Sequence, residues 1–233
     1  GGGAAGGGGA AGGGGAAGGG GAAGGGGSGG GVPDAGTDGG VGGGGGLAGD
    51  TCQDAGPVIT ATTTLANQTT LGFANDYHDA GTNCGYTAGP MAGPDRAYEV
   101  LVPPGERLTA TMTPATSSDL GVDLVAGPAA QCDGNPRVCL SGDDDGAKGV
   151  VETAQYLNAQ GTAQTVFVIV DSYRDAEKGA FSLAVTVAPP PAGDTCATPV
   201  TLAAGTALTG QTFAHFGNDL SGAGVGCAPF SAG

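Results

Sequence analysis

Beyond residue 50 the hydrophobic pattern is typical of short β-strands separated by turns. Apolar and polar residues alternate at 107–112 and again at 181–187, which predicts strands with one buried face. Residues 165–170 are apolar on both faces, as in a central strand. Gly, Pro, Asn and Asp interrupt the pattern roughly every ten residues, so a sandwich or barrel is predicted. The predicted strands cover residues 60–65, 68–73, 97–102, 107–112, 122–125, 151–157, 165–170 and 181–187.

A Gly/Ala-rich segment, residues 1–48, precedes this pattern, and its Ala pairs recur every six residues. Because Gly loses the most backbone entropy on ordering, one interpretation is a flexible tether. The period of six also equals two turns of a polyproline-II-like helix, whose all-Gly edge could pack against copies of itself in a fibre. Both interpretations stay open.

A sequence repeat divides the rest of the chain. The motif Gly49-Asp50-Thr51-Cys52 returns as Gly193-Asp194-Thr195-Cys196, after prolines at 189–191 that cannot continue a strand ladder. We therefore expect one complete module at 49–188, followed at 189–233 by a Pro linker and a truncated second copy. Since this second copy has too few strands for a sheet of its own, residues 193–233 are expected to be poorly ordered or docked onto a sheet edge.

The chain is strongly acidic, with a net charge of -15 and only six Lys and Arg residues. Nucleic acid binding needs clusters of basic residues to displace counterions, so nucleic acids are excluded as partners, and anionic lipid surfaces are disfavoured for the same reason. No signal peptide or transmembrane run is evident, and an export signal is expected upstream of residue 1.

The six cysteines indicate an oxidising compartment outside the cytosol. None belongs to a CxxC pair, and neither His has the spacing that a zinc site needs, so disulfides are the better interpretation. If the second copy repeats the pairing of the first, the expected disulfides join Cys52 to Cys84, Cys196 to Cys227, and Cys132 to Cys139.

Motifs for nucleophilic or metal-dependent catalysis are missing. The sequence has no GxSxG, HExxH or SxxK, and its two histidines, His78 and His215, lie in different copies. We therefore expect no catalytic residues and no enzyme activity.

The densest acidic cluster is Asp143, Asp144 and Asp145, between two glycines. Three adjacent carboxylates repel one another unless they are solvated or share a hard cation, and calcium binds six to eight oxygen ligands. The spacing does not match an EF-hand, so a solvated turn and a calcium site both stay open. A second and weaker acidic group comprises Asp171, Asp175 and Glu177.

Several short motifs follow one another along the first copy. They are Gly49-Asp50-Thr51-Cys52, Gly93-Pro94-Asp95 with Tyr98-Glu99-Val100, Arg107-Leu108-Thr109-Ala110-Thr111, Val122-Asp123-Leu124, Cys132 with Cys139, Gly142-Asp143-Asp144, Val168-Ile169-Val170-Asp171-Ser172-Tyr173 and Gly179-Ala180-Phe181-Ser182-Leu183. In this order they resemble the bacterial pre-peptidase C-terminal (PPC) domain, and most closely the cysteine-bearing version repeated in surface lipoproteins of deltaproteobacteria. The resemblance covers residues 49–187 and the opening of the second copy.

The resemblance implies a jelly-roll-like antiparallel β-sandwich that is exported and carries no catalytic residues. From it we expect an extracellular or outer-membrane-anchored surface module for adhesion, binding or spacing, with an unknown surface protein or polysaccharide as partner. Two alternatives are a fibre subunit that self-associates through the glycine tract, and an accessory C-terminal-type domain of a secreted protease or hydrolase. Calcium is the candidate cofactor, and the resemblance itself requires no cofactor.

Overall fold

The computed structural model describes residues 46–77, 91–134, 136–144, 146–196, 198–212 and 216–217. The chain divides into two units, residues 1–43 and 44–233, and the first unit lies wholly outside the described residues. The predictions of a tether or a fibre helix for the Gly/Ala-rich segment therefore fall almost entirely outside the described part.

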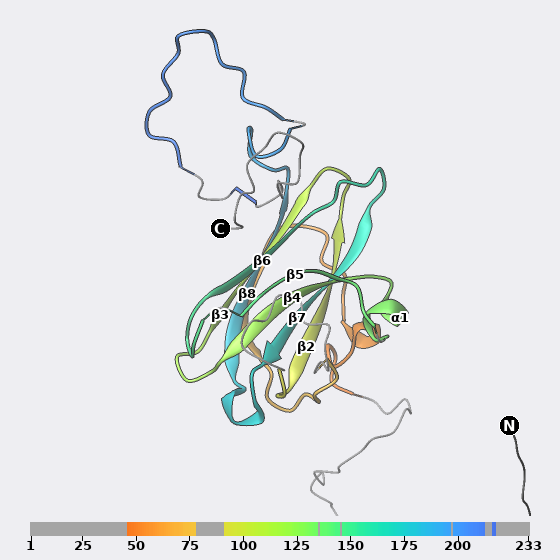
Figure 1. The fold of residues 1–233 in the computed structure, drawn as a ribbon. Coiled ribbons are helices and arrows are strands. Elements are labelled where there is room, and N and C mark those ends of the chain that lie inside the picture. The colour runs from red at the N-terminus through yellow and green to blue at the C-terminus, as the bar shows by residue number, and fades with distance from the viewer. Residues whose placement is uncertain are drawn as a thin grey trace, which may run out of the picture. The chain divides into compact units, whose positions relative to one another are not determined.

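Strands dominate the described part of the second unit (Figure 1). In chain order the elements are η1 (Cys52–Asp54), β1 (Thr63–Thr69), β2 (Asp95–Val102), β3 (Arg107–Pro114), β4 (Leu120–Ala126), α1 (Ala129–Cys132), β5 (Cys139–Asp143), β6 (Glu152–Leu157), β7 (Gln164–Ser172), η2 (Asp175–Glu177) and β8 (Ala180–Ala188). Of the described helices, none is long and apolar enough to cross a membrane.

The strands form two four-stranded sheets, in the orders β1-β8-β3-β6 and β2-β7-β4-β5. Each sheet joins strands from opposite halves of the chain in antiparallel pairs, for example β1 with β8 and β2 with β7. This order is that of a jelly roll, in which a long antiparallel hairpin is rolled into two packed sheets. The all-β, jelly-roll-like sandwich predicted from the sequence is thus confirmed.

The strand boundaries agree with the alternation in the sequence except at two places. The strands predicted at 60–65 and 68–73 are replaced by a single strand, β1, whose pairing with β8 is interrupted by a bulge between Leu65 and Gln68. Asn67 adopts a left-handed conformation there, with φ of 54°, so the break in the pattern is a bulge and not a turn. Strand β5 was not predicted, because its sequence, CLSGD, is poor in residues that favour strands.

The main core lies between the two sheets and is almost wholly aliphatic. Alternate residues of β2, β7 and β4 point into it, and β3 and β8 supply the facing side chains. Its buried members are Tyr98, Val100, Val102, Leu108, Ala110, Met112, Leu120, Val122, Leu124, Ala154, Val166, Val168, Val170, Phe181, Leu183 and Val185. Strand β7 contributes buried residues to both of its faces and lies between β2 and β4, as predicted for 165–170.

Candidate functional site

The outer face of the sheet β2-β7-β4-β5 is also covered, although it points away from the main core. A second apolar cluster forms there, with Phe167 and Ile169 of β7 as its largest members on the sheet. The short elements η1 and α1 lie side by side over this face (Figure 1). They bring Cys52 and Cys132 onto this face, where Tyr77 from the segment before β2 joins them.

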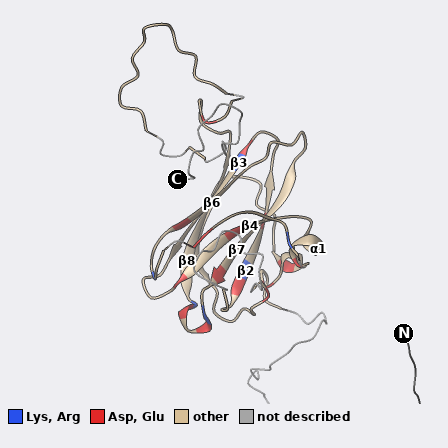
Figure 2. Cartoon of the chain, in the orientation of Figure 1, with Lys and Arg blue, Asp and Glu red and all other residues tan. Residues whose placement is uncertain are grey.

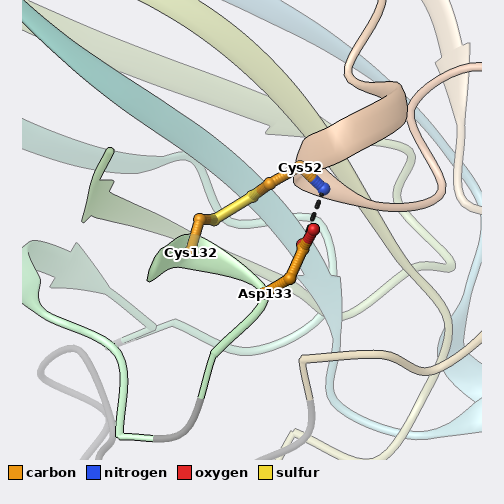
Figure 3. A group of neighbouring side chains, drawn as sticks. All are labelled: Cys52, Cys132 and Asp133. Atoms are coloured by element: carbon orange, nitrogen blue, oxygen red, sulfur yellow. Dashed lines mark hydrogen bonds between the residues drawn. A yellow bond between two sulfur atoms is a disulfide. The ribbon is translucent and has the colours of Figure 1, made fainter. Parts of the chain in front are cut away.

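A disulfide joins these two covering elements. Cys52 of η1 bonds to Cys132 of α1 across a sequence separation of 80 residues, and both cysteines are buried (Figure 3). The expected pairings of Cys52 with Cys84 and of Cys132 with Cys139 are therefore wrong. They were inferred from the repeated cysteine spacing of the two copies, whereas the rolled hairpin places the segment before β1 beside the segment after β4.

The other cysteines differ in state. Cys139 also belongs to a disulfide. Cys196 is a free and exposed thiol, so the bridge expected at Cys196 is not formed in this structure.

A polar network holds the covering elements in place beside the disulfide. The carboxylate of Asp133 accepts hydrogen bonds from the Cys52 N–H at 3.0 Å and from the Tyr77 hydroxyl at 2.7 Å. Burial raises the pKa of Tyr77 well above its ordinary range, and the neighbouring Asp133 raises it further. The hydroxyl therefore stays protonated and acts as a donor at any physiological pH.

Arg137 closes the same network. Its guanidinium donates to the carbonyl oxygens of Tyr77 and Cys132, at 2.9 and 3.2 Å, and lies 4.9 Å from the centre of the Tyr77 ring. These contacts tie the chain after α1 to the segment before β2.

The group Cys52, Cys132 and Asp133 has the residue types of a metal site, and its potential ligand atoms lie within 4.8 Å of one another. The sulfur atoms are bonded to each other, however, and a zinc ligand must be a thiolate. The group is therefore a structural staple.

Carboxylates at the end of β5 and the start of β6 accept backbone hydrogen bonds across the acidic connection between these strands. Asp143 accepts a hydrogen bond from the Thr153 N–H at 2.6 Å, and Glu152 accepts one from the Gly146 N–H at 2.9 Å. Asp144 is buried, and Asp145 lies outside the described residues. These contacts suit a structural turn, and a calcium ion at Asp143, Asp144 and Asp145 stays a prediction.

The weaker acidic group does not come together. Asp175 is paired with Lys178 at 2.6 Å on the surface, and Glu177 with Lys148 at 3.0 Å. Asp171 is instead buried on the outer face of β7, with 1% of its surface exposed. Both histidines lie outside the described residues.

A pair of buried carboxylates lies at one end of the covered outer face. Asp171 at the end of β7 stands directly opposite Asp95 at the start of β2, and Asp95 is fully buried. Figure 2 shows acidic segments on both strands where they run side by side. From the sequence, Asp95 was assigned only to the Gly93-Pro94-Asp95 motif, and Asp171 was grouped with Asp175 and Glu177 instead of with Asp95. Alternation was the available signal, since an Asp that continues the buried positions of a strand must be buried as well.

A groove of about 530 Å³ lies elsewhere, between β1 and the segment 55–63. Its wall includes Tyr98, whose hydroxyl donates to Gln68 at 3.1 Å, and Arg96, whose guanidinium lies over the rings of Phe73 and Tyr98. The groove has the size of a small-molecule site. Most of the remaining lining residues are apolar or Thr, so no ligand class is indicated.

Together the fold and this face define a disulfide-stapled jelly-roll module. No family model matches the chain, and neither a curated protein nor a solved structure matches it. The resemblance to the PPC domain therefore stays a prediction that rests on the motifs alone.

Proposed function

We propose that this protein is an exported, non-catalytic jelly-roll module of a tandem array, and that it spaces or presents neighbouring domains at the cell surface. The observation that carries it is that the second copy rebuilds the opening of the first and docks onto the first module through a buried ion pair.

The opening motif has the same backbone geometry in both copies. Gly49 and Gly193 adopt left-handed conformations, with φ of 96° and 90°. The Gly49 N–H donates to the Asp54 carbonyl oxygen at 2.5 Å, and the Gly193 N–H donates to the Thr198 carbonyl oxygen at 2.6 Å. A positive φ favours glycine, which explains why both copies start with that residue.

The aspartate of the motif also has the same role in both copies. Asp50 accepts a hydrogen bond from the Ala74 N–H, and Asp194 accepts one from the Gly217 N–H, each at 2.8 Å. The sequence repeat is therefore also a repeat of backbone geometry and hydrogen bonding at Gly193 and Asp194.

The second copy makes a further contact through the same aspartate. Asp194 forms a salt bridge with Arg107 at the start of β3, and the two side chains are only 0% and 5% exposed. Removing one member of a buried pair leaves an uncompensated charge, which costs about 3–5 kcal/mol. This contact, together with the stiff prolines of the linker, would hold successive modules in a defined orientation, as a spacer requires.

The disulfide supports the exported part of the proposal. A buried bridge that closes an 80-residue separation forms and persists in oxidising compartments and is rare in the cytosol. Alkylation of native material under denaturing, non-reducing conditions should leave Cys52 and Cys132 unmodified. Alkylation of both would overturn the export argument.

The docking part is tested by hydrogen exchange of the full chain. Asp194→Asn should speed amide exchange in residues 193–217 by about a hundredfold, the equivalent of about 3 kcal/mol. Arg107→Gln should have the same effect, and the double variant should add little, since both remove one interaction. As a matched control, Asp175→Asn removes an exposed pair and should leave the exchange unchanged. Unchanged exchange in both variants would overturn the spacer proposal and leave the export argument intact.

A further inference from the structure

Asp95 and Asp171 form the closer of the two kinds of antiparallel pair. The Asp95 N–H donates to the Ala74 carbonyl oxygen at 3.0 Å, and the Ala97 N–H donates to the Gly49 carbonyl oxygen at 2.7 Å, so both point away from β7. Asp95 and Asp171 are therefore a non-hydrogen-bonded antiparallel pair, in which the Cα atoms are about 4.5 Å apart and facing side chains come closest. Like charges in this arrangement repel.

The oxygen atoms of this pair are only partly satisfied. Asp95 Oδ2 accepts hydrogen bonds from the backbone N–H groups of Asp76 and Tyr77, at 2.8 and 2.9 Å. The other oxygen of Asp95 and Oδ1 of Asp171 are both buried and have no hydrogen-bond partner. Exposures of 0% and 1% leave these carboxylates little access to solvent. Buried charged oxygens without a partner are costly, and in folded proteins they are paired or coordinate metals.

The charges around the pair are mostly of the same sign. Asp123 lies on the same outer face of β4, two residues from Gly121, which stands opposite Asp171. Burial raises the pKa of Asp171 well above its ordinary value of 3.8, and Asp95 and Asp123 raise it further. Arg137 opposes this shift in the pKa, but its guanidinium donates to backbone carbonyl oxygens.

We propose that Asp95 and Asp171 bind one calcium ion on the outer face of the sheet, through their two unpartnered carboxylate oxygens. A hard cation with oxygen ligands suits this pair, because calcium accepts carboxylates, backbone carbonyls and waters in a flexible shell. Gly121, which stands opposite Asp171 on β4, has no side chain to compete for its carboxylate. The described residues gather no third acid within 4.8 Å of this pair, so carbonyls or water must complete the shell. The site is separate from the acidic turn at 143–145.

The test is thermal unfolding and terbium luminescence of the full chain, with calcium or with a chelator. At a calcium concentration ten times the dissociation constant, the unfolding equilibrium constant should fall about elevenfold. Asp95→Asn and Asp171→Asn should each abolish this shift and the luminescence. Should one of these variants fail to fold, the other still decides, because each removes one ligand.

Asp143→Asn is the matched control, and it should keep the calcium response. A response that is lost in Asp143→Asn and kept in Asp171→Asn would place the ion at the acidic turn and overturn the proposal. No response to calcium in the parent chain would also overturn it, and would indicate that Asp95 and Asp171 share a proton instead.

Discussion

The two faces of the sheet β2-β7-β4-β5 are built from the same strands and are buried by different means. The inner face packs aliphatic side chains against the facing sheet, and residues such as Val168 and Leu124 have no exposed surface. The outer face is covered by two short helical elements, a disulfide and hydrogen bonds around Asp133.

This difference has a physical cause. A whole sheet can bury a face by the hydrophobic effect alone, because it removes a large apolar area from water. Two elements of three and four residues bury much less apolar area. The disulfide and specific polar contacts supply the stabilisation that this smaller burial does not provide. Such a face also tolerates polar groups near its edge, and the carboxylates of Asp95 and Asp171 lie there.

Removing the disulfide that holds the cover on the outer face should have the largest effect on stability. The double variant Cys52→Ser and Cys132→Ser releases a separation of 80 residues, which the chain-entropy model values at about 4.5 kcal/mol of unfolding free energy. Urea unfolding measures the loss. The exposed thiol offers a control, since Cys196→Ser should change stability little. An equal loss of unfolding free energy in the double variant and in Cys196→Ser would mean that the disulfide does not hold the covering elements on this face.

A cavity in the inner face should come next. Leu124→Ala removes a fully buried side chain and should cost about 3 kcal/mol in urea unfolding. Leu71, which is 53% exposed, is the control, and Leu71→Ala should stay within about 0.5 kcal/mol of the parent. A loss below about 1 kcal/mol in Leu124→Ala would contradict the distinction between the two faces.

The free energy of unfolding should depend on pH through the carboxylates of the outer face. The expected change is about 2 kcal/mol, the order expected for a buried unsatisfied group. Burial raises the pKa of Asp95 and Asp171 in the folded state above 3.8, so their contribution to stability is present below that pH. It is lost as the pH rises through the folded-state pKa. In chelator, the parent should therefore unfold more easily as the pH rises above about 4.

The same pH series has its own control variants. Asp171→Asn should flatten the profile, and Asp175→Asn, at an exposed position, should not. A profile that is equally steep in Asp171→Asn would show that the slope comes from another group.

The smallest expected effect is that of one hydroxyl on the outer face. Tyr77→Phe removes the hydrogen bond to Asp133 and should cost about 1 kcal/mol. Tyr173→Phe, whose hydroxyl accepts an exposed hydrogen bond from Arg174, should cost less. Equal losses would indicate that the network around Asp133 does not stabilise the cover.

Much of the sandwich could be predicted from local patterns, and the site could not. Alternation located β3 and β8, and the doubly apolar run located β7, because burial of a strand face follows directly from a period of two. The pattern failed at Asn67, where a left-handed residue inserts a bulge, and at β5, whose residues have weak strand preference. Asp171 was noticed, but its partner was not, since nothing local relates it to Asp95.

By itself the sequence determined most of the strands, the repeat of the Gly-Asp-Thr-Cys motif, the acidic charge and the presence of cysteines that can oxidise. Only the tertiary structure decided which cysteine Cys52 meets and that Asp95 faces Asp171. The physical reason is that strand periodicity is a property of neighbouring residues, whereas these contacts depend on how the long hairpin rolls. The roll brings together segments about 80 residues apart, and no local pattern records that distance.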